Sequence, residues 1–225
     1  INTFDLKDSV RRIEAFYDDI LRHDVRPLTL GGDHTLSLPI LRAMAKKHGP
    51  LALLHIDAHA DINSHMFGEE IAHGTPFRRA FEEELLDADQ VFQIGLRGTG
   101  YTAEDFDWAS ERGFQVVQAE QLWHQSAAPL MDQIRQQIGA RPVYLSFDID
   151  SLDPAYAPGT GTPEIGGLTS IQALEIIRGC RGLSLVGADL VEVSPPYDTN
   201  GNTALLAANL LFEMLCVLPG VAYRD

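Results

Sequence analysis

Residues 51–63 read LALLHIDAHADIN, a mainly apolar run that ends in acidic and imidazole side chains on alternate residues. The run Leu51–Ile56 is short and apolar, as is typical of a strand that is buried on both faces of a parallel sheet. Asp57, His59 and Asp61 follow it directly. Carboxylates this close repel one another, and burying them without a partner costs several kcal/mol each. The sequence therefore predicts a positive partner at the end of this strand.

Apolar strand-like runs alternate with helix-like segments along the chain. Strands are expected at Pro27–Leu30, Leu51–Ile56, Gln90–Gly95, Phe114–Val117, Val143–Phe147 and Leu183–Leu190. Helices are expected at Leu36–His48, Pro76–Leu86, Ala103–Arg112, Ala128–Ile138, Ser170–Cys180 and Thr203–Leu218. This alternation predicts an α/β fold with a parallel sheet and helices on both of its faces. No repeat or flexible linker interrupts the pattern, so residues 1–225 are expected to form a single domain.

The composition argues against two classes of partner. The formal net charge of −15 disfavours nucleic acid and anionic membranes, because both bind to positive surfaces. Cys180 and Cys216 lie in apolar surroundings, which predicts buried thiols in a reducing cytoplasm rather than a disulfide framework. No apolar run reaches the roughly 18 residues of a membrane helix. We therefore expect a cytoplasmic protein.

Unusual polar residues follow four of the expected strands. GGDH (Gly31–His34) follows the first strand, and DAHAD (Asp57–Asp61) follows the second. Asp148 and Asp150 follow the strand VYLSF, and Glu192 follows the strand LVGADLV. Ligands of open parallel sheets bind beyond the carboxyl ends of the strands. The four clusters are therefore expected to share one site.

These clusters offer six side chains with the chemistry of metal ligands: His34, Asp57, His59, Asp61, Asp148 and Asp150. Their oxygen and nitrogen donors, without a thiolate, suit Mn²⁺ better than Zn²⁺, Co²⁺ or Fe²⁺. Six ligands are too many for one ion that must also bind water and substrate, so two ions that share carboxylates are expected. Such a pair, roughly 3.5–4 Å apart, can generate a hydroxide nucleophile near neutral pH. Taken singly, the DxD motif could be a turn, and Asp33 could cap a helix that begins near Thr35.

Together, these motifs resemble those of the ureohydrolases, the family of arginase, agmatinase and the guanidino-acid hydrolases. The likeness begins at about residue 25 and rests on GGDHTLSLP (Gly31–Pro39), DAHAD (Asp57–Asp61), AHGTPFRRA (Ala72–Ala80), SFDIDSLDPAYAPGTGTP (Ser146–Pro163) and VEVSPPYD (Val191–Asp198). Within the family, the likeness is greatest to guanidinobutyrase. The resemblance implies a three-layer arginase-like fold whose parallel sheet has eight strands in the family. It also implies a homotrimer or homohexamer, and an N-terminal portion that precedes Ile1 of this sequence.

The resemblance assigns a role to each polar residue. It implies two Mn²⁺ ions per subunit that share Asp57 and Asp148, and each ion has two further ligands: His34 with Asp61, and His59 with Asp150.

Four residues are implied to act on the substrate. Glu192 would hold the guanidinium group, and Asp61 would carry the proton of the nucleophile to the leaving amine. His73 would relay protons to solvent, and Thr162 would help to stabilise the tetrahedral adduct. Without the resemblance, a loop His is usually solvated, and Glu192 could form a structural salt bridge.

The resemblance further predicts hydrolysis of a linear guanidino compound to urea and a primary amine. Asn63 lies two residues after Asp61 and matches the Asn that meets the substrate carboxylate in arginase. We therefore expect 4-guanidinobutanoate as the substrate, with 4-aminobutanoate as the second product. Agmatine or guanidinopropanoate are the alternatives, and Asn63 could instead brace its own loop.

Two other classes of protein are alternatives. A deacetylase with the same architecture would use a single Zn²⁺ ion, and the doubled ligand set Asp57, His59 and Asp61 disfavours it. A catalytically inactive ureohydrolase-like scaffold is disfavoured because all six ligands, His73 and Glu192 are present.

Overall fold

Six parallel strands form one open sheet in the computed structural model, which describes residues 1–100 and 104–222, with backbone alone for 104–106. The strands are β1 (Leu28–Leu30), β2 (Leu51–Ile56), β3 (Leu86–Leu96), β4 (Gln115–Gln118), β5 (Pro142–Asp148) and β6 (Ser184–Val191). Their spatial order is β1-β6-β5-β2-β3-β4, and every pair is parallel. The predicted α/β class with a parallel sheet is confirmed.

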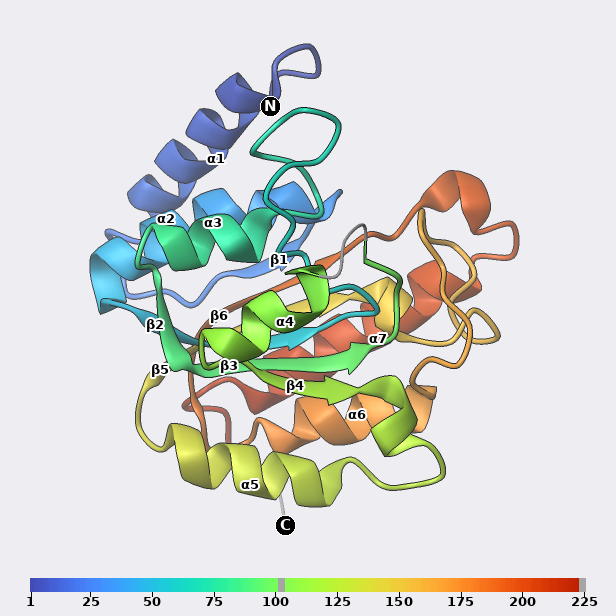
Figure 1. Ribbon diagram of the computed structural model, residues 1–225. Helices are drawn as coiled ribbons and strands as arrows, with labels where there is room; N and C mark the ends of the chain where they lie inside the picture. The colour runs from blue at the N-terminus through green and yellow to red at the C-terminus, as the bar shows by residue number, and fades with distance from the viewer. Residues whose placement is uncertain (101–103, 223–225) are drawn as a thin grey trace.

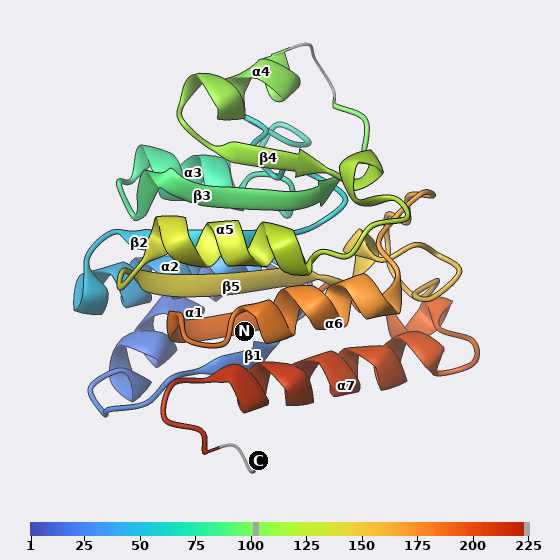
Figure 2. The same ribbon diagram turned by 90° about the horizontal axis from the view of Figure 1, so that it is seen from below.

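Helices cover both faces of the sheet, so the fold has three layers (Figures 1 and 2). One face carries α1 (Leu6–Ile20), α2 (Ser37–His48) and α3 (Pro76–Glu82), and α4 (Glu104–Glu111) joins their hydrophobic cluster near β4. The other face carries α5 (Ala128–Ile138), α6 (Ser170–Gly179) and α7 (Asn202–Val217).

Strand β2 lies at the centre of the hydrophobic core. Leu51 and Leu53 pack into the cluster beneath α1, α2 and α3. Ala52, Leu54 and Ile56 pack into the opposite cluster beneath α5, α6 and α7. All six residues of the strand are buried. Because both faces are covered, the strand is apolar without alternation except at His55, which explains the pattern seen in the sequence.

The largest difference from the expected boundaries lies between α3 and β3. The helix was predicted over Pro76–Leu86 but ends at Glu82, and Glu84 has a left-handed backbone (φ 58°). Leu85 and Leu86 fit the helical spacing, but the carbonyl of Leu85 accepts a hydrogen bond from the Leu51 amide, and Leu86 already pairs with β2. Ala103, the predicted start of the next helix, lies outside the described residues.

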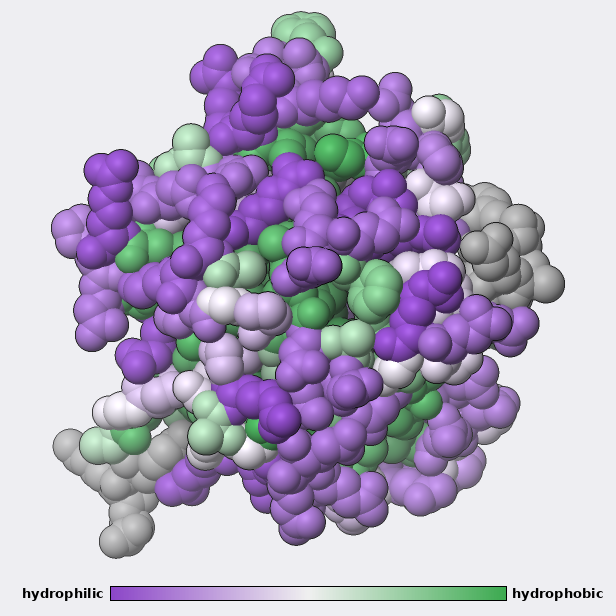
Figure 3. Space-filling model, turned by 60° about the vertical axis from the view of Figure 1, so that its left-hand side comes forward, coloured by the Kyte–Doolittle hydropathy of each residue, from purple (hydrophilic) through white to green (hydrophobic). Residues whose placement is uncertain are grey.

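Hydrophilic residues cover most of the face shown in Figure 3, with small apolar areas between them. The chain as a whole has 32 acidic and 17 basic residues, which gives a formal net charge of −15. Within the described part of the chain, no helix combines the length and apolar character needed to cross a membrane.

Candidate metal centre

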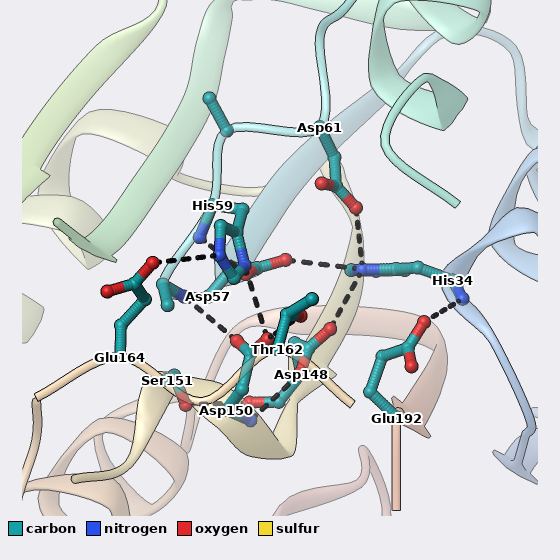
Figure 4. A network of polar contacts seen from close by, with 12 residues as sticks. His34, Asp57, His59, Asp61, Asp148, Asp150, Ser151, Thr162, Glu164 and Glu192 are labelled. Carbon is teal, nitrogen blue, oxygen red and sulfur yellow. Dashed lines mark hydrogen bonds and ion pairs between the residues drawn. The ribbon is translucent and has the colours of Figure 1, made fainter. Parts of the chain in front are cut away.

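The order of the strands brings the predicted ligands to one edge of the sheet. β1, β6, β5 and β2 are consecutive neighbours, and their carboxyl ends carry His34, Glu192, the pair Asp148 and Asp150, and the DAHAD segment, respectively. These side chains converge from separate elements on a common centre (Figure 4). The sequence also allowed Asp33 to be a helix cap, and its side chain does accept a hydrogen bond from the Thr35 amide at the start of the first helical turn. Asp33 is thus a cap, while the next residue, His34, is directed into the cluster.

His34 organises the first of two groups of possible metal ligands. Its Nδ1 lies 3.0 Å from an oxygen of Asp61, 3.2 Å from Asp57 Oδ2 and 3.3 Å from Asp148 Oδ2. The imidazole and all three carboxylates are buried. One nitrogen and three carboxylate oxygens therefore surround a space suited to a divalent ion.

His59 organises the second group. Its Nδ1 lies 3.2 Å from Asp150 Oδ2 and 3.5 Å from Asp57 Oδ1. The two oxygens of Asp57 thus face different groups, Oδ2 toward His34 and Oδ1 toward His59. Two sets of side chains have the spacing of a metal site, one of His34, His55, Asp57 and Asp61 and the other of Asp57, His59 and Asp150. Asp57 belongs to both sets, so it is placed where two ions could share it.

The electrostatics of the cluster show that it needs positive charge. Burial, followed by the charges of Asp150 and Asp57, raises the pKa of Asp148 well above its usual range. Burial acts to lower the pKa of His34, but hydrogen bonds to acidic neighbours outweigh it and raise that pKa well above its ordinary value. The pKa of His59 rises to about 11, because Asp150 and Asp57 outweigh the effect of burial. The protons that these groups retain are what metal cations would displace.

A buried relay tests whether His34 fits a metal ligand. The hydroxyl of Ser146 donates to Asp189 Oδ1 at 2.7 Å, so Ser146 Oγ accepts from His34 Nε2 at 2.8 Å. The hydroxyls of Ser37 and Tyr144 donate to the other oxygen of Asp189 and hold it in place. A neutral His34 therefore directs its Nδ1 lone pair at three acidic oxygens, which is favourable only when a cation lies between them. The residues fit a metal ion.

Gly98 provides the space for the imidazole of His59. A Cβ atom at Gly98 would lie 2.4 Å from His59 Cδ2 and 3.0 Å from His59 Nε2. Glu164 Oε1 also lies 3.9 Å from Nε2 of this ring. The ring thus lies close to both the loop after β3 and the loop that carries Glu164.

Gly98→Ala is expected to displace His59 and remove about one of two bound divalent ions. The measurement is metal content per subunit after dialysis, by elemental analysis. Gly32→Ala is the matched control, because a Cβ there meets no heavy atom within 4 Å. Retention of two ions by the Gly98 variant would show that His59 does not need this space.

Two acidic residues of the site have strained backbones. Asp61 (φ 53°) and Glu192 (φ 63°) adopt the left-handed conformation, which costs roughly 1–3 kcal/mol for such residues and is typical of functional sites. Glu192 Oε1 accepts a hydrogen bond from the His34 amide at 2.8 Å. Burial raises the pKa of Glu192 to about 7, although this hydrogen bond opposes the shift. A cationic ligand beside Glu192 would offset the cost of burying its charge.

A cavity of about 710 Å³ opens over the carboxylates. This volume lies within the range of roughly 300–1,000 Å³ that is usual for small-molecule sites. Asp61, Glu192 and the half-buried His73 line it together with residues of both metal groups. His73 therefore shares the cavity with the possible metal ligands, as the resemblance requires of a proton relay.

Asn63 and Thr162, two of the residues expected near the substrate, each donate a hydrogen bond to a neighbouring part of the chain. Asn63 lines the cavity, and its Nδ2 donates to the carbonyl of Gly74 at 3.0 Å, which braces the loop next to His73. One N–H of this amide is still available to a ligand. The hydroxyl of Thr162 donates to Asp150 Oδ2 at 3.2 Å and also lines the cavity.

Sequence reasoning missed four buried residues that support the ligands: His55, Gln93, Ser146 and Asp189. All four are fully buried in strands that are otherwise mainly apolar. Ser146 and Asp189 hold His34, whereas His55 contacts Asp57 and Gln93 contacts His55. For His55 and Ser146, the available signal was a polar residue inside a mainly apolar strand, two residues before a predicted ligand.

An open parallel sheet with two adjoining His–Asp groups at its strand ends defines an α/β protein with a possible metal site. The chain belongs to the arginase family, whose family model matches residues 1–216. The predicted resemblance to the ureohydrolases is thereby confirmed.

Individual relatives match the whole chain or nearly all of it. It is 70% identical over 224 residues to guanidinobutyrase of Pseudomonas aeruginosa, spanning 100% of this chain and 70% of that protein. It is 61% identical to the mitochondrial guanidino acid hydrolase of Homo sapiens, spanning 98% of this chain and 63% of that protein. The structure of proclavaminate amidino hydrolase from Streptomyces clavuligerus superposes with a TM-score of 0.89 at 41% identity, covering 95% of this chain and 72% of that one. The chain thus spans less than two thirds of its human relative.

Proposed function

We propose that the protein is a binuclear manganese hydrolase that cleaves the guanidino group of 4-guanidinobutanoate, giving urea and 4-aminobutanoate. The observation that carries the proposal is the pair of His–Asp groups that share Asp57, in a chain of the arginase family. Its 70% identity to a protein named guanidinobutyrase supports the choice of substrate.

The donor atoms support the choice of metal. The ligands offer carboxylate oxygens and imidazole nitrogens without a thiolate, as Mn²⁺ prefers. Asp57 and Asp148 would be shared, and the remaining ligands fall into the two groups around His34 and His59. When bound, the two ions would activate the attacking water by lowering its pKa toward about 7.

The residues of the chain would bind the substrate and move its protons. Glu192, held by the His34 amide, would bind the guanidinium group through charge-assisted hydrogen bonds. Water adds to the guanidinium carbon, and the bond from that carbon to the substituted nitrogen breaks. Asp61 would take one proton from the attacking water and pass it to the departing nitrogen, which leaves as a neutral amine. The hydroxyl proton that remains on the carbon product then passes to this amine, which gives urea and an ammonium ion. His73, half-buried in the same cavity, would exchange protons with solvent.

The distal end of the substrate would be recognised by Asn63. The second N–H of its amide can donate to a carboxylate while the first braces the loop at Gly74. Thr162, through its contact with Asp150, would lie near the tetrahedral adduct. A cytoplasmic location and assembly as a homotrimer or homohexamer remain predictions from the sequence.

A panel of four guanidines tests the function. With Mn²⁺, we expect kcat/KM for 4-guanidinobutanoate to exceed that for 3-guanidinopropanoate by roughly 10- to 100-fold, the usual value of one methylene. Arginine and agmatine should be poorer still, because neither ends in a lone carboxylate. Urea release is the measurement.

The same panel distinguishes the alternatives. A higher kcat/KM for agmatine would overturn recognition of a carboxylate and favour an agmatinase. Asn63→Ala should reduce the ratio of kcat/KM for 4-guanidinobutanoate to kcat/KM for agmatine. If Asn63 only braces the loop, its removal would lower kcat/KM for both substrates by a similar factor. No urea from any of the four would support an inactive scaffold.

A further inference from the structure

His55 lies inside β2 and is fully buried beside the metal groups. Its Nε2 is 2.7 Å from Asp57 Oδ2. It also lies close enough to His34, Asp57 and Asp61 to count among the possible ligands of the first ion. The position of His55 therefore allows two roles, as a seventh metal ligand or as a hydrogen-bond donor to the bridging carboxylate.

Gln93, on the neighbouring strand β3, decides between these roles. Its Nε2 donates to the carbonyl of Ala60 at 2.7 Å and also lies 3.0 Å from His55 Nδ1. A carbonyl oxygen only accepts, so Ala60 fixes the orientation of the Gln93 amide. His55 Nδ1 must then accept the second N–H, which leaves the imidazole proton on Nε2, facing Asp57. A nitrogen that carries a proton cannot ligate a metal ion.

The surroundings hold the imidazole in this position. The ring centroid of Phe77, from α3, lies 4.1 Å from the ring centroid of His55 and 5.2 Å from that of His34. Gln93 and Phe77 are both fully buried. The His55 ring is thus confined by an apolar contact on one side and a fixed amide on the other.

Both oxygens of Asp57 are anchored in a similar manner. Oδ1 accepts the His59 amide at 2.6 Å, and Oδ2 accepts from His55 at 2.7 Å. Each oxygen uses one lone pair for its anchor and keeps another for a cation. The carboxylate is therefore held with one oxygen directed toward each metal group.

We propose that His55 is a positioning residue that donates Nε2–H to Asp57 and fixes this carboxylate in its bridging orientation, with Gln93 selecting the tautomer. The inference rests on the proposed binuclear centre. Neighbours of this kind commonly change metal affinity by about 10- to 100-fold when they are removed.

Two substitutions in the full-length protein separate a donor from a ligand. His55→Leu removes the donor, and His55→Gln keeps an N–H at a similar reach. We expect His55→Leu to weaken Mn²⁺ binding by roughly 10- to 100-fold and to reduce the spin-coupled electron paramagnetic resonance signal of paired ions. His55→Gln should bind two ions with affinity within about threefold of wild type, a change smaller than this 10- to 100-fold range. His65→Leu, at an exposed histidine, is the matched control.

The outcomes have distinct meanings. If both His55 variants lose one Mn²⁺ ion, His55 is a metal ligand. If both variants bind Mn²⁺ with unchanged affinity, His55 has no positioning role. Either result overturns the proposal. If His55→Leu does not fold, long-range ¹H–¹⁵N spectra of the wild-type protein decide, because a proton on His55 Nε2 is required and a bare Nε2 contradicts it. Wild-type protein that binds no Mn²⁺ would instead contradict the proposed metal centre itself.

Discussion

Replacement of Asp57 by alanine is expected to abolish urea release and to remove bound Mn²⁺. Asp57 belongs to both groups of metal ligands, and each of its oxygens faces one of them. Without this carboxylate, the remaining acidic side chains cannot hold two cations close together. We expect activity to fall by more than about 10³-fold, the upper end of the loss from one preorganised electrostatic group. Urea assay and elemental analysis of the same sample are the measurements.

Asp132→Ala is the matched control for this variant. Asp132 is exposed on α5, where it pairs with Arg135, and its removal should leave metal content and urea release unchanged. Asp57→Ala protein that still holds two ions per subunit and remains fully active would refute the bridging role.

Glu192→Gln is expected to reduce kcat/KM strongly while the metal content stays at two ions. The amide keeps the shape of the side chain and can still accept the hydrogen bond from the His34 amide. It loses the negative charge that would bind the guanidinium group. We expect a loss of roughly 10²- to 10³-fold in kcat/KM, equivalent to about 2.7–4 kcal/mol. Steady-state kinetics with 4-guanidinobutanoate measures it.

Glu120→Gln controls for a loss of charge within the same cavity, because Glu120 lines it but belongs to neither metal group. This variant should retain near wild-type kcat/KM. If Glu192→Gln lost its metal ions together with its activity, Glu192 would support the metal centre rather than bind substrate.

The secondary structure could be read from the sequence because the strands are covered on both faces. The runs around Leu51–Ile56 and Val143–Phe147 are continuously buried, so their apolar composition marks them clearly. Loops at the carboxyl ends of such strands collect polar residues. This rule alone predicts that DAHAD, the DxD motif and Glu192 lie at one edge of the sheet.

The order of the strands could not be derived in this way. β1 pairs with β6, although 153 residues (31–183) lie between the end of β1 at Leu30 and the start of β6 at Ser184. Local pattern carries no information about which distant strand lies alongside, because helix packing and crossover connections decide it. The end of α3 was missed for a similar reason, since Leu85 bonds to β2 rather than continuing the helix.

The supporting residues of the site are also long-range features. His34 reaches Ser146 across 112 residues, and Ser146 reaches Asp189 across 43. His55 is close to Asp57 in sequence, but its role depends on Gln93, 38 residues away. Each is a buried polar residue within a strand, and only the assembled sheet reveals its partner.

Anomalous X-ray scattering at the manganese edge, from crystals of the complete protein grown with Mn²⁺, tests the central claim most directly. We expect two anomalous peaks per subunit, about 3.5–4 Å apart, as in other two-metal sites. One should lie beside His34 and the other beside His59, with Asp57 between them. A single peak, or none at these side chains, would contradict it.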